Sequence, residues 1–109
     1  MPSKARFNAF SQAVIARDGN VCKVCNGCKN VNPHLITQSI HLPAGGYVFE
    51  NGIMLCYSCR IEALEYHRGY VKCKGLSPED LYLLIGSSKE AAHIASVASA
   101  ESIEFNDSK

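Results

Sequence analysis

The chain has 109 residues, of which 47% are hydrophobic, so it can form one domain with a modest core, and its six cysteines offer the staple that a small domain often needs. No apolar run approaches the roughly 18 residues of a membrane span, and the start MPSKARFNAFSQAV lacks the apolar core of a secretory signal, so a cytoplasmic location is expected. Residues 1–29 carry a charge of +4, residues 30–75 carry +1 and residues 76–109 carry −4, for a net charge of +1. This distribution permits nucleic-acid binding, but it is less basic than usual for a dedicated non-specific DNA-binding protein.

The N-terminal half is predicted to form a helix, a cysteine-rich turn and a hairpin. Apolar residues recur at helical spacing over residues 5–17, and Gly19 suits the C-terminal cap of that helix. The segment HLITQSIHL at 34–42 is rich in β-branched residues, the turn PAGG follows it, and YVFENGIML at 47–55 is a second extended segment. These two segments resemble a hairpin with a loose loop.

The C-terminal half is predicted to be helical. A helix over residues 57–66 is broken by GYVKCKG, and LSPEDLYLLIG contains a short helix with Ser77 as its N-cap, Pro78 at its first position and Gly86 at its end. An alanine-rich helix is expected over 89–100, as part of a helical extension over residues 76–100. Residues 101–109 are expected to fray.

Four cysteines have the spacing of a zinc site. They form two C-x-x-C pairs, namely Cys22 with Cys25 and Cys56 with Cys59. The two-residue gap lets both thiolates of a pair reach one ion at about 2.3 Å, and two pairs complete a tetrahedron. In a cytoplasmic protein such thiols stay reduced, so zinc is favoured over disulfides and over the alternative of small buried side chains.

The two remaining cysteines have weaker claims on the metal. Cys28 extends the first pair to C-x-x-C-x-x-C, so it could replace Cys25 or donate a hydrogen bond near the site. Cys73 is interpreted as an ordinary, partly buried thiol. A closed four-cysteine site has no vacancy for water or substrate, so any chemistry must use other residues.

The order of the motifs resembles the HNH family of endonucleases, in the type that carries a zinc knuckle. RDGNVCKVC is followed by PHLI, by ENGIMLCYSC and by a helix that contains His67, over about residues 15–68. In that family a histidine ends the first strand, an asparagine precedes the second cysteine pair, and a histidine lies on the helix. The resemblance implies the ββα-metal fold, a hairpin packed on a helix.

The resemblance also implies a function, that of a metal-dependent DNA endonuclease or nickase. His34 would be the general base, since imidazole can activate water near neutral pH. Asn51 would hold a loop or orient that base, and His67 would bind a catalytic Mg²⁺, Mn²⁺ or Ni²⁺ at the scissile phosphate. Small proteins of this kind are frequent in phage genomes, which suggests a phage or bacterial source, with the host cytoplasm as location if phage-encoded.

Two positions depart from the family pattern. Pro33 stands where an Asp or His often binds the catalytic metal, and Arg60 stands where a histidine commonly follows the second cysteine pair. His67 lies eight residues after Cys59, further than the usual spacing. His41 could supply the ligand that Pro33 cannot.

Each of these residues also has an interpretation without catalysis. Arg60 could contact a phosphate directly or be a solvated arginine near Glu62 and Glu65. His34 could be satisfied by a backbone carbonyl, and Asn51 could be a turn residue before glycine. The remaining histidines could simply be solvent-exposed: His41, His67 and His93.

Three functions therefore stay open. The presence of His34, Asn51 and His67 favours the HNH endonuclease. Pro33 and Arg60 favour an inactive HNH-like zinc protein that binds DNA or another protein, and a zinc-knuckle adaptor unrelated to nucleases is the third.

We predict an α+β fold for a single domain over residues 1–109. Its zinc-stapled ββα-metal core would be flanked by N- and C-terminal helices, which we expect to pack within the chain because the apolar DLYLLI needs a partner surface.

Overall fold

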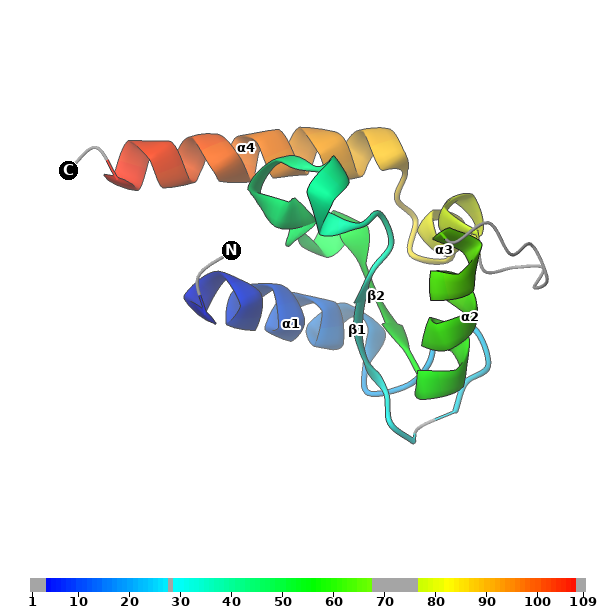
Figure 1. Cartoon of the computed structure of the whole chain (residues 1–109). Helices are drawn as coiled ribbons and strands as arrows, with labels where there is room; N and C mark the ends of the chain where they lie inside the picture. The colour runs from blue at the N-terminus through cyan, green and yellow to red at the C-terminus, as the bar shows by residue number, and fades with distance from the viewer. Residues whose placement is uncertain (1–3, 28, 68–76, 108–109) are drawn as a thin grey trace.

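The computed structural model describes residues 4–27, 29–67 and 77–107. Within these ranges the chain forms one two-stranded sheet, four α-helices and three short 3-10 helices (Figure 1), so the predicted α+β class is confirmed. In chain order the elements are α1 (Lys4–Asp18), β1 (Asn32–Leu35), η1 (Ser39–His41), η2 (Pro43–Gly46), η3 (Phe49–Asn51), β2 (Gly52–Leu55), α2 (Tyr57–His67), α3 (Pro78–Leu84) and α4 (Lys89–Asp107).

The first helix, α1, ends as its sequence predicts. Gly19 has a φ of 75°, and its backbone N–H donates to the carbonyl of Ile15 at 2.7 Å. This is the glycine-based C-terminal cap that the sequence indicated. Phe10 and Val14 are buried, whereas Phe7 is 47% exposed, so the apolar face that contacts the core is narrow.

The hairpin is present, but its strands are shorter than predicted. The strands β1 and β2 pair antiparallel over four residues each, with His34 opposite Ile53 and Pro33 opposite Met54. The prediction of extended structure over 34–42 and 47–55 was wrong for most of these residues, because three 3-10 helices lie within residues 39–51. Gly45 and Gly46 both have positive φ, which lets the chain turn tightly there.

Strand β2 is the centre of the core. All four of its residues are buried because helices cover both of its faces, α1 on one side and α2 on the other (Figure 1). Ile53 and Leu55 belong to one apolar cluster, and Met54 packs with Phe10 and Val14 in a second. The alternation of side chains along a strand therefore assigns successive residues to two separate clusters.

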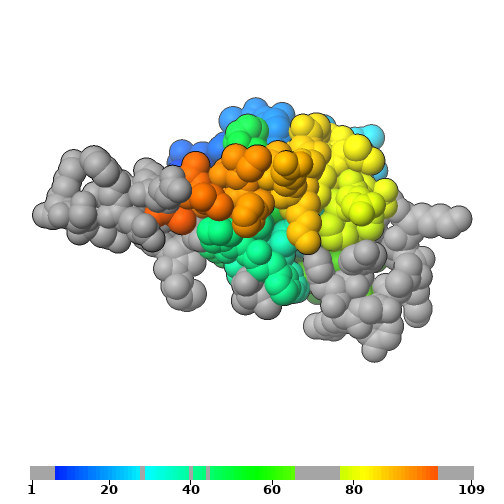
Figure 2. Space-filling model, turned by 90° about the horizontal axis from the view of Figure 1, so that it is seen from above, coloured from blue at the N-terminus to red at the C-terminus, as the bar shows by residue number. Residues whose placement is uncertain are grey.

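The C-terminal helices pack within the chain, as expected. Ser77 caps α3 by accepting a hydrogen bond from the backbone N–H of Asp80, and Leu81 and Tyr82 enter the core while Leu83 stays 77% exposed. The long helix α4 lies across the loop between the strands (Figures 1 and 2). It runs beyond the predicted end near residue 100 and into the segment for which fraying was expected.

The segment GYVKCKG lies outside the described residues. None of the helices that the structure describes is both long enough and apolar enough to cross a membrane.

Candidate functional site

Two local turns present the four cysteines of the predicted metal site. The first is a tight turn in which the N–H of Asn26 donates to the carbonyl of Cys22 at 2.9 Å and Asn26 itself has a φ of 64°. The second begins α2, where the N–H of Arg60 donates to the carbonyl of Cys56 at 2.9 Å. Each turn places its two thiols on the same side of the chain.

The four thiols converge at the base of the hairpin. The Sγ atoms of Cys22, Cys25, Cys56 and Cys59 all lie within 4.8 Å of one another, and those of Cys25 and Cys56 are 3.6 Å apart. Tetrahedral coordination at about 2.3 Å per bond requires sulfur atoms about 3.8 Å apart. The cluster therefore has the donors and the size for a structural zinc ion, with no ligand position left for water.

The ionisation of these thiols is consistent with a cation between them. Burial tends to raise the pKa of Cys22, but hydrogen bonds from backbone N–H groups, led by that of Cys25, outweigh burial and lower it to about 6. Burial and the neighbouring thiols raise the pKa of Cys59. A backbone hydrogen bond at Gly27 lowers the pKa of Cys25, but the adjacent thiols reverse this and raise it. Four crowded thiols cannot all ionise without a positive ion to offset their repulsion.

The structure does not test the predicted roles of the two other cysteines. Cys28 and Cys73 both lie outside the described residues, so their predicted roles stay predictions.

His34 lies in the hairpin, in the middle of the paired strand β1. Its side chain is 5% exposed, and its partner across the sheet is Ile53. Pro33 precedes it and offers no side-chain ligand for a metal.

Asn51 is fully buried and binds the loop of the hairpin. Its Oδ1 accepts a hydrogen bond from the backbone N–H of Thr37 at 2.9 Å. Its Nδ2 donates to the carbonyls of Thr37 at 3.0 Å and Gly46 at 3.1 Å. The side chain thus joins the two ends of the loop, which is more than an ordinary turn residue does.

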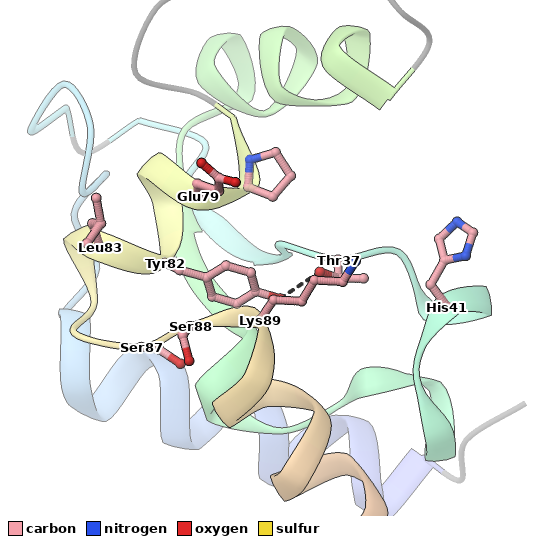
Figure 3. Close-up of a pocket in the computed structure, with 9 residues that line it drawn as sticks. Thr37, His41, Glu79, Tyr82, Leu83, Ser87, Ser88 and Lys89 are labelled. Atoms are coloured by element: carbon pink, nitrogen blue, oxygen red, sulfur yellow. Dashed lines mark hydrogen bonds between the residues drawn. The ribbon is translucent and has the colours of Figure 1, made fainter.

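Tyr82, in α3, completes this network and was missed by the sequence analysis. Its hydroxyl donates to Oδ1 of Asn51 at 2.7 Å and lies 2.6 Å from Oγ1 of Thr37 (Figure 3). Burial raises the pKa of Tyr82, which keeps the hydroxyl protonated. The sequence held one hint, a hydroxyl-bearing side chain within the apolar run DLYLLI.

A second missed group fastens α1 to the hairpin. The guanidinium of Arg17 donates to the carbonyls of Phe49, at 2.7 Å, and Gly52, and it forms an ion pair with Asp18. The carboxylate of Asp18 accepts from the backbone N–H of Met54 at 3.2 Å. The sequence indicated no role for either side chain in holding the hairpin.

The other predicted histidines lie on different elements from His34. His67 is the last residue of α2, and its side chain lies outside the described residues. His41 is exposed and, with Lys89, lines a pocket of ≈ 830 Å³ over Tyr82 (Figure 3). His93 is exposed on α4, as expected.

Arg60 packs on an aromatic ring. Its guanidinium carbon lies 6.0 Å from the ring centroid of Tyr57. Among the described residues it forms no ion pair with Glu62 or Glu65.

The hairpin therefore combines a four-thiol centre at its base with His34 in one strand and Asn51 beside the other. Comparison with protein-family models, curated proteins and solved structures finds no match to this chain.

Proposed function

We propose that this protein is a metal-dependent DNA endonuclease or nickase of the HNH type, which hydrolyses phosphodiester bonds. One observation carries the proposal: Asn51, which ends η3, binds both backbone groups of Thr37, three residues after His34 on the same chain segment. Asn51 thus holds the segment that follows His34, in a hairpin whose base carries the four-thiol cluster, and the family resemblance implies an asparagine that holds a loop near the general base.

In this proposal His34 is the general base that takes a proton from the attacking water. Its side chain is only 5% exposed, so the proposal requires water and a phosphate to gain access to it when DNA binds. A divalent cation, held with the help of His67, would supply stabilisation of the charge that develops on the phosphate.

The four cysteines have a separate role in the proposal. A tetrahedral zinc ion with four sulfur ligands has no open position, so it would hold the base of the hairpin and take no part in hydrolysis. Cys22 and Cys59 both enter the same apolar cluster as Ile53 and Leu55, so the zinc ion would fasten β2 to α2.

The test is a supercoiled-plasmid nicking assay with added Mg²⁺, Mn²⁺ or Ni²⁺. We expect the zinc-loaded natural protein to nick and His34→Ala to nick at least about 100-fold more slowly, since a general base contributes roughly that much. His93→Ala is the matched control, because His93 is exposed on α4, outside the hairpin. Absence of nicking by zinc-loaded natural protein with every ion, or equal loss in the control, would contradict the proposal.

The second candidate function is a non-catalytic zinc protein that uses the same hairpin to bind DNA. Pro33 and Arg60 occupy positions where the family commonly has metal ligands, and the guanidinium of Arg60 packs on Tyr57, beside the cysteine cluster. A gel-shift assay that shows binding but no nicking, with affinity reduced by Arg60→Ala, would favour this function.

A further inference from the structure

A buried polar network joins the C-terminal extension to the loop of the hairpin. Asn51 is 0% exposed, Tyr82 3% and Thr37 7%, so water does not replace the bonds between them. Buried polar groups of this kind are costly unless each finds a partner.

The donors and acceptors of this network have only one consistent arrangement. The hydroxyl proton of Tyr82 goes to Oδ1 of Asn51 at 2.7 Å, so Tyr82 can only accept from Thr37. The Thr37 hydroxyl therefore donates to the Tyr82 oxygen at 2.6 Å. This chain of bonds fixes which way the Asn51 amide faces, since Oδ1 must point toward two donors and Nδ2 toward two carbonyls.

We propose that Tyr82 is a positioning residue, whose hydroxyl holds the Asn51 amide and thereby fixes the segment that follows His34. The catalytic part of this inference rests on the proposed function, and the structural part does not. Thr37 is bound by Asn51 through both its N–H and its carbonyl, and the backbone N–H of Ile36 donates to the Asn51 carbonyl at 2.9 Å. The segment that follows β1 therefore keeps this conformation only as long as the Asn51 amide keeps its orientation.

Tyr82 would act on catalysis only through Asn51. Its hydroxyl is already bonded to Asn51 and Thr37, so its loss should lower kcat through the loop and leave KM unchanged. A misplaced general base slows reaction steeply, and we expect kcat to fall about tenfold in Tyr82→Phe.

The first measurement is amide hydrogen exchange of the zinc-loaded protein by NMR. In Tyr82→Phe the N–H of Thr37 should exchange about tenfold faster, because its acceptor is no longer held in place. The N–H of Met54, bonded to Asp18 elsewhere in the hairpin, should keep its natural rate. This comparison separates local release of the loop from general destabilisation, which would accelerate both amides alike.

Matched variants test the hydroxyl itself. Tyr47→Phe is the control, because the Tyr47 ring packs on Phe10 and its hydroxyl forms no hydrogen bond among the described residues. Thr37→Val removes the donor to Tyr82, and Thr37→Ser restores it, so the serine variant should recover the natural exchange rate and kcat.

The outcomes are distinct. Faster exchange at Thr37 alone, with a lower kcat at unchanged KM and recovery in Thr37→Ser, would support the inference. Unchanged exchange at Thr37, equal acceleration at Met54, or a change in KM instead of kcat would overturn it. If the natural protein does not nick at all, the proposed function fails, and the exchange rates alone decide whether Tyr82 positions Asn51.

Discussion

The buried polar side chains of this protein differ in whether they have hydrogen-bond partners. The side chain of Asn51 forms four hydrogen bonds in the core, two through each polar atom. Ser96, on α4, is equally buried, but among the described residues its hydroxyl has no partner. The bonded amide of Asn51 therefore fixes the conformation of the loop, whereas the buried hydroxyl of Ser96 only adds a desolvation penalty.

Ser96→Ala should therefore stabilise the protein. Removing an unpaired buried hydroxyl and adding a better helix former should raise the free energy of unfolding by about 1 kcal/mol. Ser88→Ala is the control at the start of the same helix: Ser88 precedes α4, and its hydroxyl accepts from the N–H of Ala91 at 3.0 Å, so its loss should cost about 1 kcal/mol. Denaturant unfolding at saturating zinc measures both, and equal destabilisation by the two variants would refute the interpretation of Ser96.

At the level of elements, α1 and β2 approach each other closely at one glycine. A Cβ atom at Gly52 would lie 2.5 Å from Cγ2 of Val14 and 2.6 Å from Cε1 of Phe10. The φ of Gly52 is −115°, which any residue can adopt, so the requirement for glycine here is steric.

Gly52→Ala should destabilise the protein by about 1–3 kcal/mol, because α1 must move away from the hairpin. Gly86→Ala isolates the backbone contribution, since Gly86 has a φ of 67° with nothing within 4 Å, and strain there should cost about 1 kcal/mol. Thermal unfolding of the two variants checks the comparison. A loss at Gly52 smaller than that at Gly86 would show that α1 adjusts freely.

The elements that the sequence predicted well are those with local signals. Gly19, Ser77 and Gly86 marked helix ends through their own backbone preferences, and the structure places each of them there. The strand lengths were wrong because β-branched residues near 36–40 favour strands, whereas tertiary packing folds this loop into 3-10 helices under α4.

The candidate site was predictable to a similar extent. The spacing of the cysteines was sufficient to identify the four-thiol cluster, because each pair forms within a single turn. Tyr82 could not be found this way, since it meets Asn51 across 31 residues of sequence and no local pattern encodes that contact. Arg17 was missed for the same reason, as its partners at Phe49 and Gly52 lie 32 and 35 residues away.

At the level of the whole molecule, the four-cysteine cluster joins segments that form the core. Cys22 lies shortly after α1, and Cys59 lies in α2. One ion bound to both cysteines would therefore link the chain segments of the two helices that cover opposite faces of β2. Binding of a structural metal would add directly to the stability of the fold.

Metal removal should therefore unfold the hairpin and α2 together. A strong chelator should abolish much of the helical circular dichroism, and added zinc should restore it. Acid should have the same effect, because protons compete with the metal ion for the four thiolates. Retention of full helicity in chelator would contradict the structural role.

The measurement that tests the metal centre most directly is the absorption spectrum of the protein with cobalt(II) in place of zinc. We predict the spectrum of four thiolate ligands in the natural protein and in Cys28→Ser, and its loss in Cys25→Ser, since the Sγ of Cys25 lies within 4.8 Å of the other three. A natural protein that binds no cobalt, or one that keeps its four-thiolate spectrum in Cys25→Ser and loses it in Cys28→Ser, would contradict the centre described here.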